Sequence, residues 1–152
     1  MPQSLAQIYL HLIFSTRERE SWITPILRHE MHAYMAGISR ELDAPAIQVG
    51  GVSDHVHVLA HFPRTLTVSK WVELLKTQSN RWFKQQSTEN NRNLFAWQKG
   101  YGVFSVSPSH LDLVKTYIRN QETHHRTVTF KDEYRKIMDK YNVQYDERYV
   151  WD

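Results

Sequence analysis

Apolar side chains recur along the chain with two different spacings. Where they alternate with polar residues or run together over a few positions, they predict strands, which we expect at residues 8–14, 46–52, 55–62 and 101–106. Where they recur every three or four residues, they predict helices, which we expect over residues 25–42, 67–86, 109–121 and 130–141.

The predicted elements follow the order β-α-β-β-α-β, with further helices toward the C-terminus. This order is typical of a ferredoxin-like (RRM-like) antiparallel sheet, so we expect an α+β fold in a single domain spanning residues 1–152. Such a sheet can pack helices against one face and present the other face to a ligand.

Several boundaries of these elements carry local signals. Gly50-Gly51 permits a bulge or a close approach of another backbone, and Ser53-Asp54 suits the turn between two strands. Three helix starts carry a hydroxyl residue that can cap the helix, followed by proline or by an acidic residue: Thr24-Pro25, Ser109 with Asp112, and Thr129 with Asp132.

Composition places the chain among ordinary globular proteins, with 41% hydrophobic and 23% charged residues. No stretch approaches the roughly 18 apolar residues that a membrane span needs, and residues 1–4 lack the layout of a signal peptide. The simplest expectation is a cytoplasmic protein of a bacterial or archaeal cell. The sequence contains no cysteine, which excludes disulfides and thiolate zinc sites.

The net charge of +3 is unevenly distributed. Residues 64–100 contain seven basic and two acidic residues, with five tryptophan and phenylalanine residues interleaved. Phosphate contacts and base stacking use this mixture, so a nucleic acid is a reasonable partner, although a solvated helix face with core aromatics gives the same pattern. The candidate phosphate contacts are Arg17, Arg19, Lys70, Arg81 and Lys84.

Two histidines occupy alternate positions of a predicted strand. His55 and His57 point to one face of the sheet, while Val56 and Val58 point to the other. If the valines face the core, the two imidazoles stand on the open face and can chelate one cation. The sequence contains nine histidines, so a chance pair is the alternative.

Tyr117 and Gln121 lie four residues apart on a predicted helix and therefore share one face. A phenol can serve as a nucleophile, and an amide oxygen beside it can serve as a metal ligand. Eight tyrosines are present, so spacing alone does not distinguish Tyr117 from a packing residue. We interpret His124 and His125 as helix-end residues, and Asp54 as a turn residue or a partner of a ligating imidazole.

Taken together, these segments resemble the HUH single-tyrosine transposases of the IS200/IS605 insertion-sequence group. The resemblance covers nearly the whole chain, and it depends on the order of several short motifs. These motifs are residues 9–17, His55-Val56-His57, residues 97–105, Tyr117-Ile118-Arg119-Asn120-Gln121, residues 130–134 and residues 145–149.

The resemblance implies that His55, His57 and Gln121 are metal ligands and that Tyr117, on the additional C-terminal helices, attacks the scissile phosphate. The cofactor implied is a divalent metal, Mg²⁺ or Mn²⁺. Members of the family act on single-stranded DNA, recognise subterminal hairpins and form a 5′-phosphotyrosine intermediate. They are homodimers in which the tyrosine helix can complete the partner's site.

Two other hypotheses remain open from the sequence. One is a non-catalytic or domesticated ferredoxin-like protein that binds nucleic acid. The other is a metal phosphoesterase that uses water, in which Tyr117 would be dispensable for cleavage.

Overall fold

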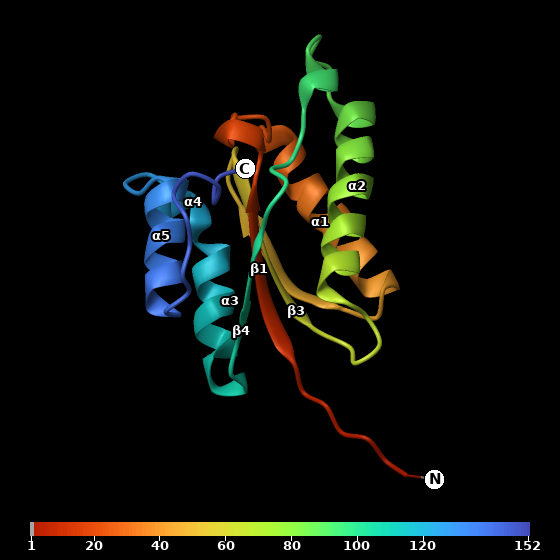
Figure 1. The fold of residues 1–152 in the computed structure, drawn as a ribbon. Coiled ribbons are helices and arrows are strands. Elements are labelled where there is room, and N and C mark those ends of the chain that lie inside the picture. The colour runs from red at the N-terminus through yellow and green to blue at the C-terminus, as the bar shows by residue number, and fades with distance from the viewer. Residues whose placement is uncertain (1) are drawn as a thin grey trace.

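A four-stranded antiparallel sheet separates two layers of helices (Figure 1). The structure is a computed structural model and describes residues 2–152. The strands are β1 (Tyr9–Ser15), β2 (Ala46–Gly51), β3 (His55–His61) and β4 (Gly102–Ser105), and their order across the sheet is β2-β3-β1-β4. A βαββαβ chain folded in this order is ferredoxin-like, so the predicted α+β fold is confirmed.

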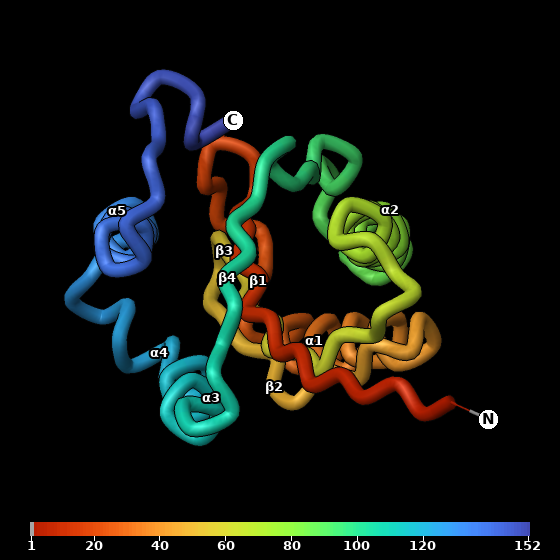
Figure 2. Tube along the Cα trace, turned by 60° about the horizontal axis from the view of Figure 1, so that its bottom comes forward, coloured from red at the N-terminus to blue at the C-terminus, as the bar shows by residue number. Residues whose placement is uncertain are grey.

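The helices divide evenly between the two faces of the sheet. Figure 2 shows α1 (Pro25–Glu41) and α2 (Val68–Gln86) on one side of the strands, and α3 (Leu111–Arg119), α4 (Gln121–His124) and α5 (Phe130–Lys140) on the other. Three short 3-10 turns complete the connections: η1 (Arg17–Arg19), η2 (Arg92–Leu94) and η3 (Pro108–His110). None of the helices described in residues 2–152 has the length and apolar character needed to cross a membrane.

The main core lies between the sheet and the layer of α1 and α2. Alternation along the strands sends Leu12 and Phe14 of β1, and Val56 and Val58 of β3, into this core, where all four are fully buried. The side chain of Trp71 on α2 is the largest of the fully buried ones and packs in the same cluster. The predicted inward direction of the two valines is therefore confirmed.

The opposite face of the sheet is covered, which corrects the expectation of an open face. Leu59 on β3 packs with Ile118 on α3, and Ile13 on β1 packs with Phe130 and Tyr134 on α5. The physical reason is that α3 and α5 each carry an apolar stripe, and a stripe of this kind is buried against another apolar surface. The side chains that the strands send to this face are consequently enclosed.

Two glycines allow the C-terminal helices to approach the sheet closely. A Cβ atom at Gly50 on β2 would lie 2.8 Å from Cγ2 of Ile118 and nearer still to its carbonyl oxygen. A Cβ atom at Gly102 on β4 would lie 2.5 Å from the hydroxyl oxygen of Tyr134 on α5. The close backbone approach predicted at Gly50-Gly51 is confirmed, whereas the register shift of β2 lies at residues 46–48 instead.

Side-chain capping occurs at one of the three predicted helix starts. Thr129 accepts a hydrogen bond from the backbone N–H of Asp132 at 3.2 Å, as predicted. Thr24 precedes its helix as predicted, but its side chain makes no capping hydrogen bond. The capping box at Ser109 is wrong, because Ser109 lies inside the 3-10 turn η3 and α3 begins only at Leu111.

Candidate functional site

The two histidines of β3 lie between the sheet and the C-terminal helices. His55 and His57 point to the same face, as their spacing predicts, and both are fully buried. They are enclosed because α3, α4 and α5 cover this face, whereas the sequence pattern left it open. A pair of imidazoles shielded from water interacts strongly with any charged group brought beside it.

Helices α3 and α4 bring Tyr117 and Gln121 to the same place. The predicted continuous helix is interrupted at Asn120 (φ −94°, ψ 19°), but Gln121 still follows Tyr117 by about one turn. The Oε1 atom of Gln121 lies 3.0 Å from Nε2 of His55, and the ring of Tyr117 meets that of His57 edge-on, with centroids 5.8 Å apart. All four predicted site residues therefore meet within one chain.

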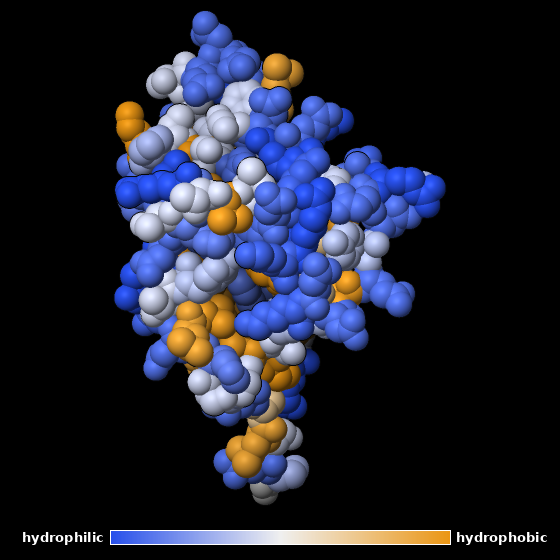
Figure 3. Space-filling view, turned by 90° about the vertical axis from the view of Figure 1, so that its left-hand side faces the viewer, coloured by the Kyte–Doolittle hydropathy of each residue, from blue (hydrophilic) through white to orange (hydrophobic). Residues whose placement is uncertain are grey.

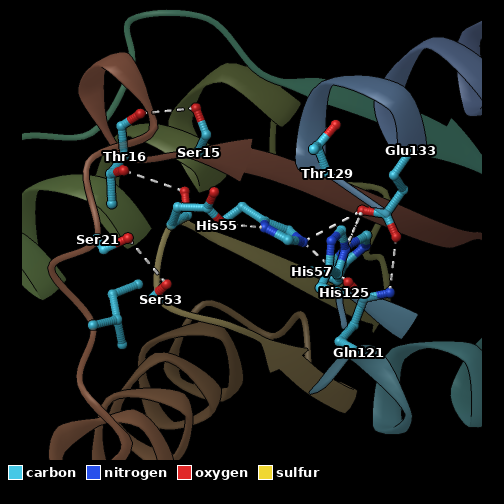
Figure 4. A network of polar contacts seen from close by, with 12 residues as sticks. Ser15, Thr16, Ser21, Ser53, His55, His57, Gln121, His125, Thr129 and Glu133 are labelled. Carbon is cyan, nitrogen blue, oxygen red and sulfur yellow. Dashed lines mark hydrogen bonds and ion pairs between the residues drawn. The ribbon is translucent and has the colours of Figure 1, made fainter. Parts of the chain in front are cut away.

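Glu133, on the first turn of α5, lies at the centre of this cluster (Figure 4). Its Oε1 atom lies 3.1 Å from Nε2 of His57, 3.3 Å from Nε2 of His55 and 3.2 Å from Nε2 of His125. Its other oxygen, Oε2, accepts hydrogen bonds from the amide of Gln121 and from the hydroxyl of Tyr117. One carboxylate thus joins the two halves of the predicted site.

The sequence analysis did not single out Glu133, although a signal was present. Glu133 lies three residues after Phe130 and four before Ile137, and both of these belong to the apolar stripe of α5. A carboxylate at such a position must be buried, and buried carboxylates are normally paired or bound to a metal. Its exposed fraction of 2% matches this reasoning.

His11 and His125 also belong to the cluster, and neither was predicted as a site residue. His11 on β1 places its Nε2 atom 2.8 Å from Nδ1 of His57. His125 directly follows α4, so its helix-end position is correct, but its ring turns inward and meets the ring of His55 with centroids 4.4 Å apart. Because these contacts link segments far apart in the sequence, spacing alone could not indicate them.

Hydrogen bonds from outside the cluster determine which ring nitrogens face Glu133. Nδ1 of His55 lies 2.7 Å from a carboxylate oxygen of Asp54, and Nδ1 of His125 lies 2.6 Å from the carbonyl oxygen of Val128. Both partners only accept hydrogen bonds, so each Nδ1 atom carries the proton. In the neutral rings the Nε2 lone pairs consequently point toward Glu133, and Nε2 of His125 is buried without a hydrogen-bond partner.

The electrostatics of the cluster follow from burial and from this carboxylate. Burial opposes the charged form of His55, but hydrogen bonds from Asp54 and Glu133 outweigh it and raise the pKa of His55 to about 9. Burial lowers the pKa of His57. Although burial acts in the other direction, His57 and the neighbouring imidazoles hold the pKa of Glu133 well below its usual range.

Tyr117 is affected in the opposite sense. Burial, followed by the negative charge of Glu133, raises the pKa of the Tyr117 hydroxyl above its usual value. The phenol is therefore protonated at neutral pH in the chain alone, and it donates its proton in a hydrogen bond to the carboxylate. A positive charge at the centre of the cluster would make this proton easier to lose.

The donor set fits a divalent cation. One ligand atom each from His55, His57 and Glu133 lies within 4.8 Å of the others, and the same holds for His124, His125 and Glu133. Several lone pairs converge on one buried point, and a cation there would relieve their mutual repulsion. Imidazole, carboxylate and amide oxygen together form an intermediate ligand set that suits Mn²⁺ and also Mg²⁺.

The predicted phosphate contacts lie elsewhere on the molecule. Lys70, Arg81 and Lys84 are on α2, which covers the opposite face of the sheet from the histidines. Arg17 and Arg19 lie in η1 at the end of β1, and Arg19 donates a hydrogen bond to the carbonyl oxygen of Trp151 at 2.9 Å. The structure does not bring these side chains to the site.

Comparison with known proteins agrees with this arrangement. The profile of the family described as "Transposase IS200 like" matches residues 4–121, which is more than half of the chain. No curated protein sequence matches.

Two solved structures share the fold. A candidate transposase from Deinococcus radiodurans R1 is 20% identical, with a TM-score of 0.63, over 80% of this chain and 95% of that one. A REP-associated tyrosine transposase bound to a REP hairpin is 13% identical, with a TM-score of 0.60, over 84% of this chain and 74% of that one. Fold, sequence profile and the meeting of Tyr117 with the buried histidines lead to one conclusion: the chain belongs to the family of IS200-like transposases.

Proposed function

We propose that the chain is a metal-dependent transposase that cleaves and rejoins single-stranded DNA through a covalent intermediate on Tyr117. The observation that carries this proposal is the position of Glu133, which contacts the Tyr117 hydroxyl with one oxygen and the His55 and His57 imidazoles with the other. A nucleophile and a cation site that share one carboxylate can act on the same phosphate.

The residues proposed to hold the divalent metal are His55, His57 and Gln121, together with Glu133. Asp54 orients His55 through the Nδ1 hydrogen bond, and His11 contacts the corresponding nitrogen of His57. When bound, Mg²⁺ or Mn²⁺ supplies positive charge that neutralises the scissile phosphate and orients it for in-line attack.

In the proposed cleavage step the Tyr117 oxygen forms a bond to phosphorus, and the bond from phosphorus to the 3′ oxygen breaks. Glu133 accepts a hydrogen bond from the phenol and is placed to receive its proton. The products are a 5′-phosphotyrosine and a free 3′-hydroxyl. Because the phosphodiester energy is kept in the covalent link, attack by another 3′-hydroxyl rejoins the strands without a nucleotide cofactor.

The proposed partner is single-stranded DNA with hairpin ends. Support comes from the family and from the REP-associated relative of the same fold, whose structure contains a REP hairpin. A homodimer in which Tyr117 serves the partner's His55 and His57 remains a prediction from the resemblance. A mixture of His55→Ala and Tyr117→Phe subunits tests it, because a trans site with both functional halves restores activity and a cis arrangement does not.

Incubation with single strands from both ends of the flanking DNA tests the main proposal. With Mg²⁺ or Mn²⁺ we expect a protein–DNA adduct that survives a denaturing gel and maps to Tyr117 by mass spectrometry. Tyr117→Phe should abolish the adduct, while Tyr149→Phe, at an exposed tyrosine in the C-terminal segment, should leave it intact. Cleavage that persists in Tyr117→Phe would indicate a phosphoesterase that uses water, and binding without cleavage would indicate a non-catalytic protein.

A further inference from the structure

A cavity of about 620 Å³ opens beside Tyr117, between α3, α5 and the end of β4. Its inner end is formed by Tyr117 and Glu133, so the cavity leads directly to the proposed nucleophile. Its volume lies within the range of roughly 300–1,000 Å³ that is typical of small-ligand sites. Nothing in the proposed chemistry described above uses this space.

The walls of the cavity are largely apolar, although the cavity is open to solvent. Leu113 on α3 is 69% exposed and Tyr141, just after α5, is 38% exposed, and both line it together with Val106, Val114 and Ile137. Figure 3 faces the side formed by α3 and α5 and shows apolar side chains gathered beside strongly hydrophilic ones below the centre of this face. Apolar side chains left exposed together at a hollow indicate a binding surface.

Tyr141 is held in a defined orientation. Its ring stacks on that of Phe104 on β4, with centroids 4.9 Å apart and an interplanar angle of 19°. Phe104 is itself buried, so it supports one face of the Tyr141 ring. An aromatic ring supported in this way is suited to stacking against a planar group such as a nucleobase.

The rim of the cavity is positively charged. Lys136 and Lys140 lie one turn apart on α5, both are exposed, and neither forms an ion pair within the described residues 2–152. His110 in η3 adds a third group that can carry positive charge. Among the described residues that line the cavity, Glu133 is the one carboxylate, and it lies at the inner end.

We propose that this groove binds a nucleotide adjacent to the scissile phosphate, with its base between Leu113 and Tyr141 and its backbone along Lys136 and Lys140. The inference rests on the proposed function and adds the path of the DNA strand. The strand would reach Tyr117 along α5, on the opposite face of the sheet from the basic residues of α2. Stacking accepts any base, so the groove positions the strand and leaves recognition of sequence to other contacts.

A nucleotide accounts for the groove better than a protein segment does. A peptide would cover the apolar wall but leave the two lysines without a partner, whereas one nucleotide offers a flat base and a charged phosphate together. The groove also ends at a tyrosine whose proposed substrate is a backbone phosphate. The strand must be unpaired, because a base that stacks on Tyr141 cannot remain inside a duplex.

Binding and photocrosslinking of a short oligonucleotide test the proposal. The protein is Tyr117→Phe in EDTA, and the probe is a fluorescein-labelled thymidine hexamer with one 5-iododeoxyuridine, which has no hairpin. We expect the crosslink to map to Tyr141 or to a neighbouring residue of the groove. Tyr141→Ala should weaken binding about tenfold, while Tyr141→Phe should retain it, since stacking needs only the ring.

Matched substitutions outside the groove serve as controls. Tyr149→Ala and Leu94→Ala change residues that are 64% and 72% exposed, and they should bind the hexamer as the parent protein does, unlike Tyr141→Ala and Leu113→Ala. The pair Lys136→Gln and Lys140→Gln should lower the salt dependence of binding by about 0.7 for each lost phosphate contact. Thermal unfolding of each variant verifies that the fold is kept.

Crosslinks confined to α2, or equal effects in the groove variants and their controls, would overturn the proposal. So would a second copy of the chain in the groove, detected as a dimer that Leu113→Ala dissociates in sedimentation experiments. Because the assay needs neither metal nor cleavage, its result is separate from the adduct assay. A Tyr117 adduct without crosslinks in the groove refutes only the groove, and crosslinks without an adduct refute only the catalytic proposal.

Discussion

Substitution of Gly50 by alanine is predicted to impair both stability and strand cleavage, although Gly50 touches neither DNA nor metal. Gly50 lies on β2 where α3 packs against the sheet, and a Cβ atom there would overlap the carbonyl oxygen of Ile118. Ile118 is fully buried and directly follows Tyr117 in the chain. The clash is with the backbone of α3, so it cannot be relieved by turning a flexible side chain.

The magnitude follows from the cost of overpacking. Forcing an extra methyl group into a close-packed site typically costs about 1–3 kcal/mol, and here it must also displace α3. A displacement of about 1 Å at the reacting group can slow a reaction by about 100-fold. We therefore expect Gly50→Ala to lose about 1–3 kcal/mol in the free energy of unfolding and to form the Tyr117 adduct at least tenfold more slowly.

Gly37→Ala is the matched control. Gly37 lies within α1, and the nearest atom to an added Cβ is a guanidinium nitrogen of Arg40 at 4.0 Å. Alanine in a helix interior is favoured over glycine, so this variant should gain about 0.5–1 kcal/mol and keep its cleavage rate. Urea unfolding measures the free energies, and time courses on denaturing gels measure the adduct. A Gly50→Ala protein with unchanged stability and rate would refute the reasoning.

Three further predictions concern charged groups. Asp54→Asn removes the anionic acceptor of His55 Nδ1 and should weaken Mn²⁺ binding about 10- to 100-fold in calorimetric titration; an unchanged affinity would contradict the role of Asp54. Despite burial, hydrogen bonds raise the pKa of His55 from 6.5 to about 9, so in EDTA its stabilisation of about 3 kcal/mol should be complete below pH 6.5 and lost as the pH rises through 9. Urea unfolding across this range should show the decline in the parent protein and a flatter profile in His55→Gln. Lys76→Met removes hydrogen bonds of 2.7 Å to two carbonyl oxygens of residues 98–100 and should cost about 1–3 kcal/mol, whereas Lys99→Met at an exposed site should cost almost nothing.

Much of the fold could be predicted because it depends on local periodicity. The alternation around Val56 and Val58 placed both valines in the core, and it thereby placed His55 and His57 together on the other face. The four-residue spacing of Tyr117 and Gln121 likewise held across the break at Asn120. The end of a helix is less predictable than its existence, which explains the error at Ser109.

The layer over the histidines could not be predicted from periodicity. The apolar stripes of α3 and α5 require a surface to cover, but a stripe does not state which surface it meets. Gly50 was a partial signal, since it indicated a close approach without naming Ile118 as the neighbour. Whether the histidine face is open or enclosed therefore depended on how the C-terminal helices pack.

The sequence by itself determined the order of the elements, the shared direction of the two histidines and the neighbourhood of Tyr117 and Gln121, because strand and helix periods act within a few residues. Only the tertiary structure decided that Glu133 joins them, through a contact with His57 across 76 positions of the chain. Such a contact arises when separate elements bury their apolar faces together. That packing encloses the carboxylate with the imidazoles and so creates the charge balance of the site.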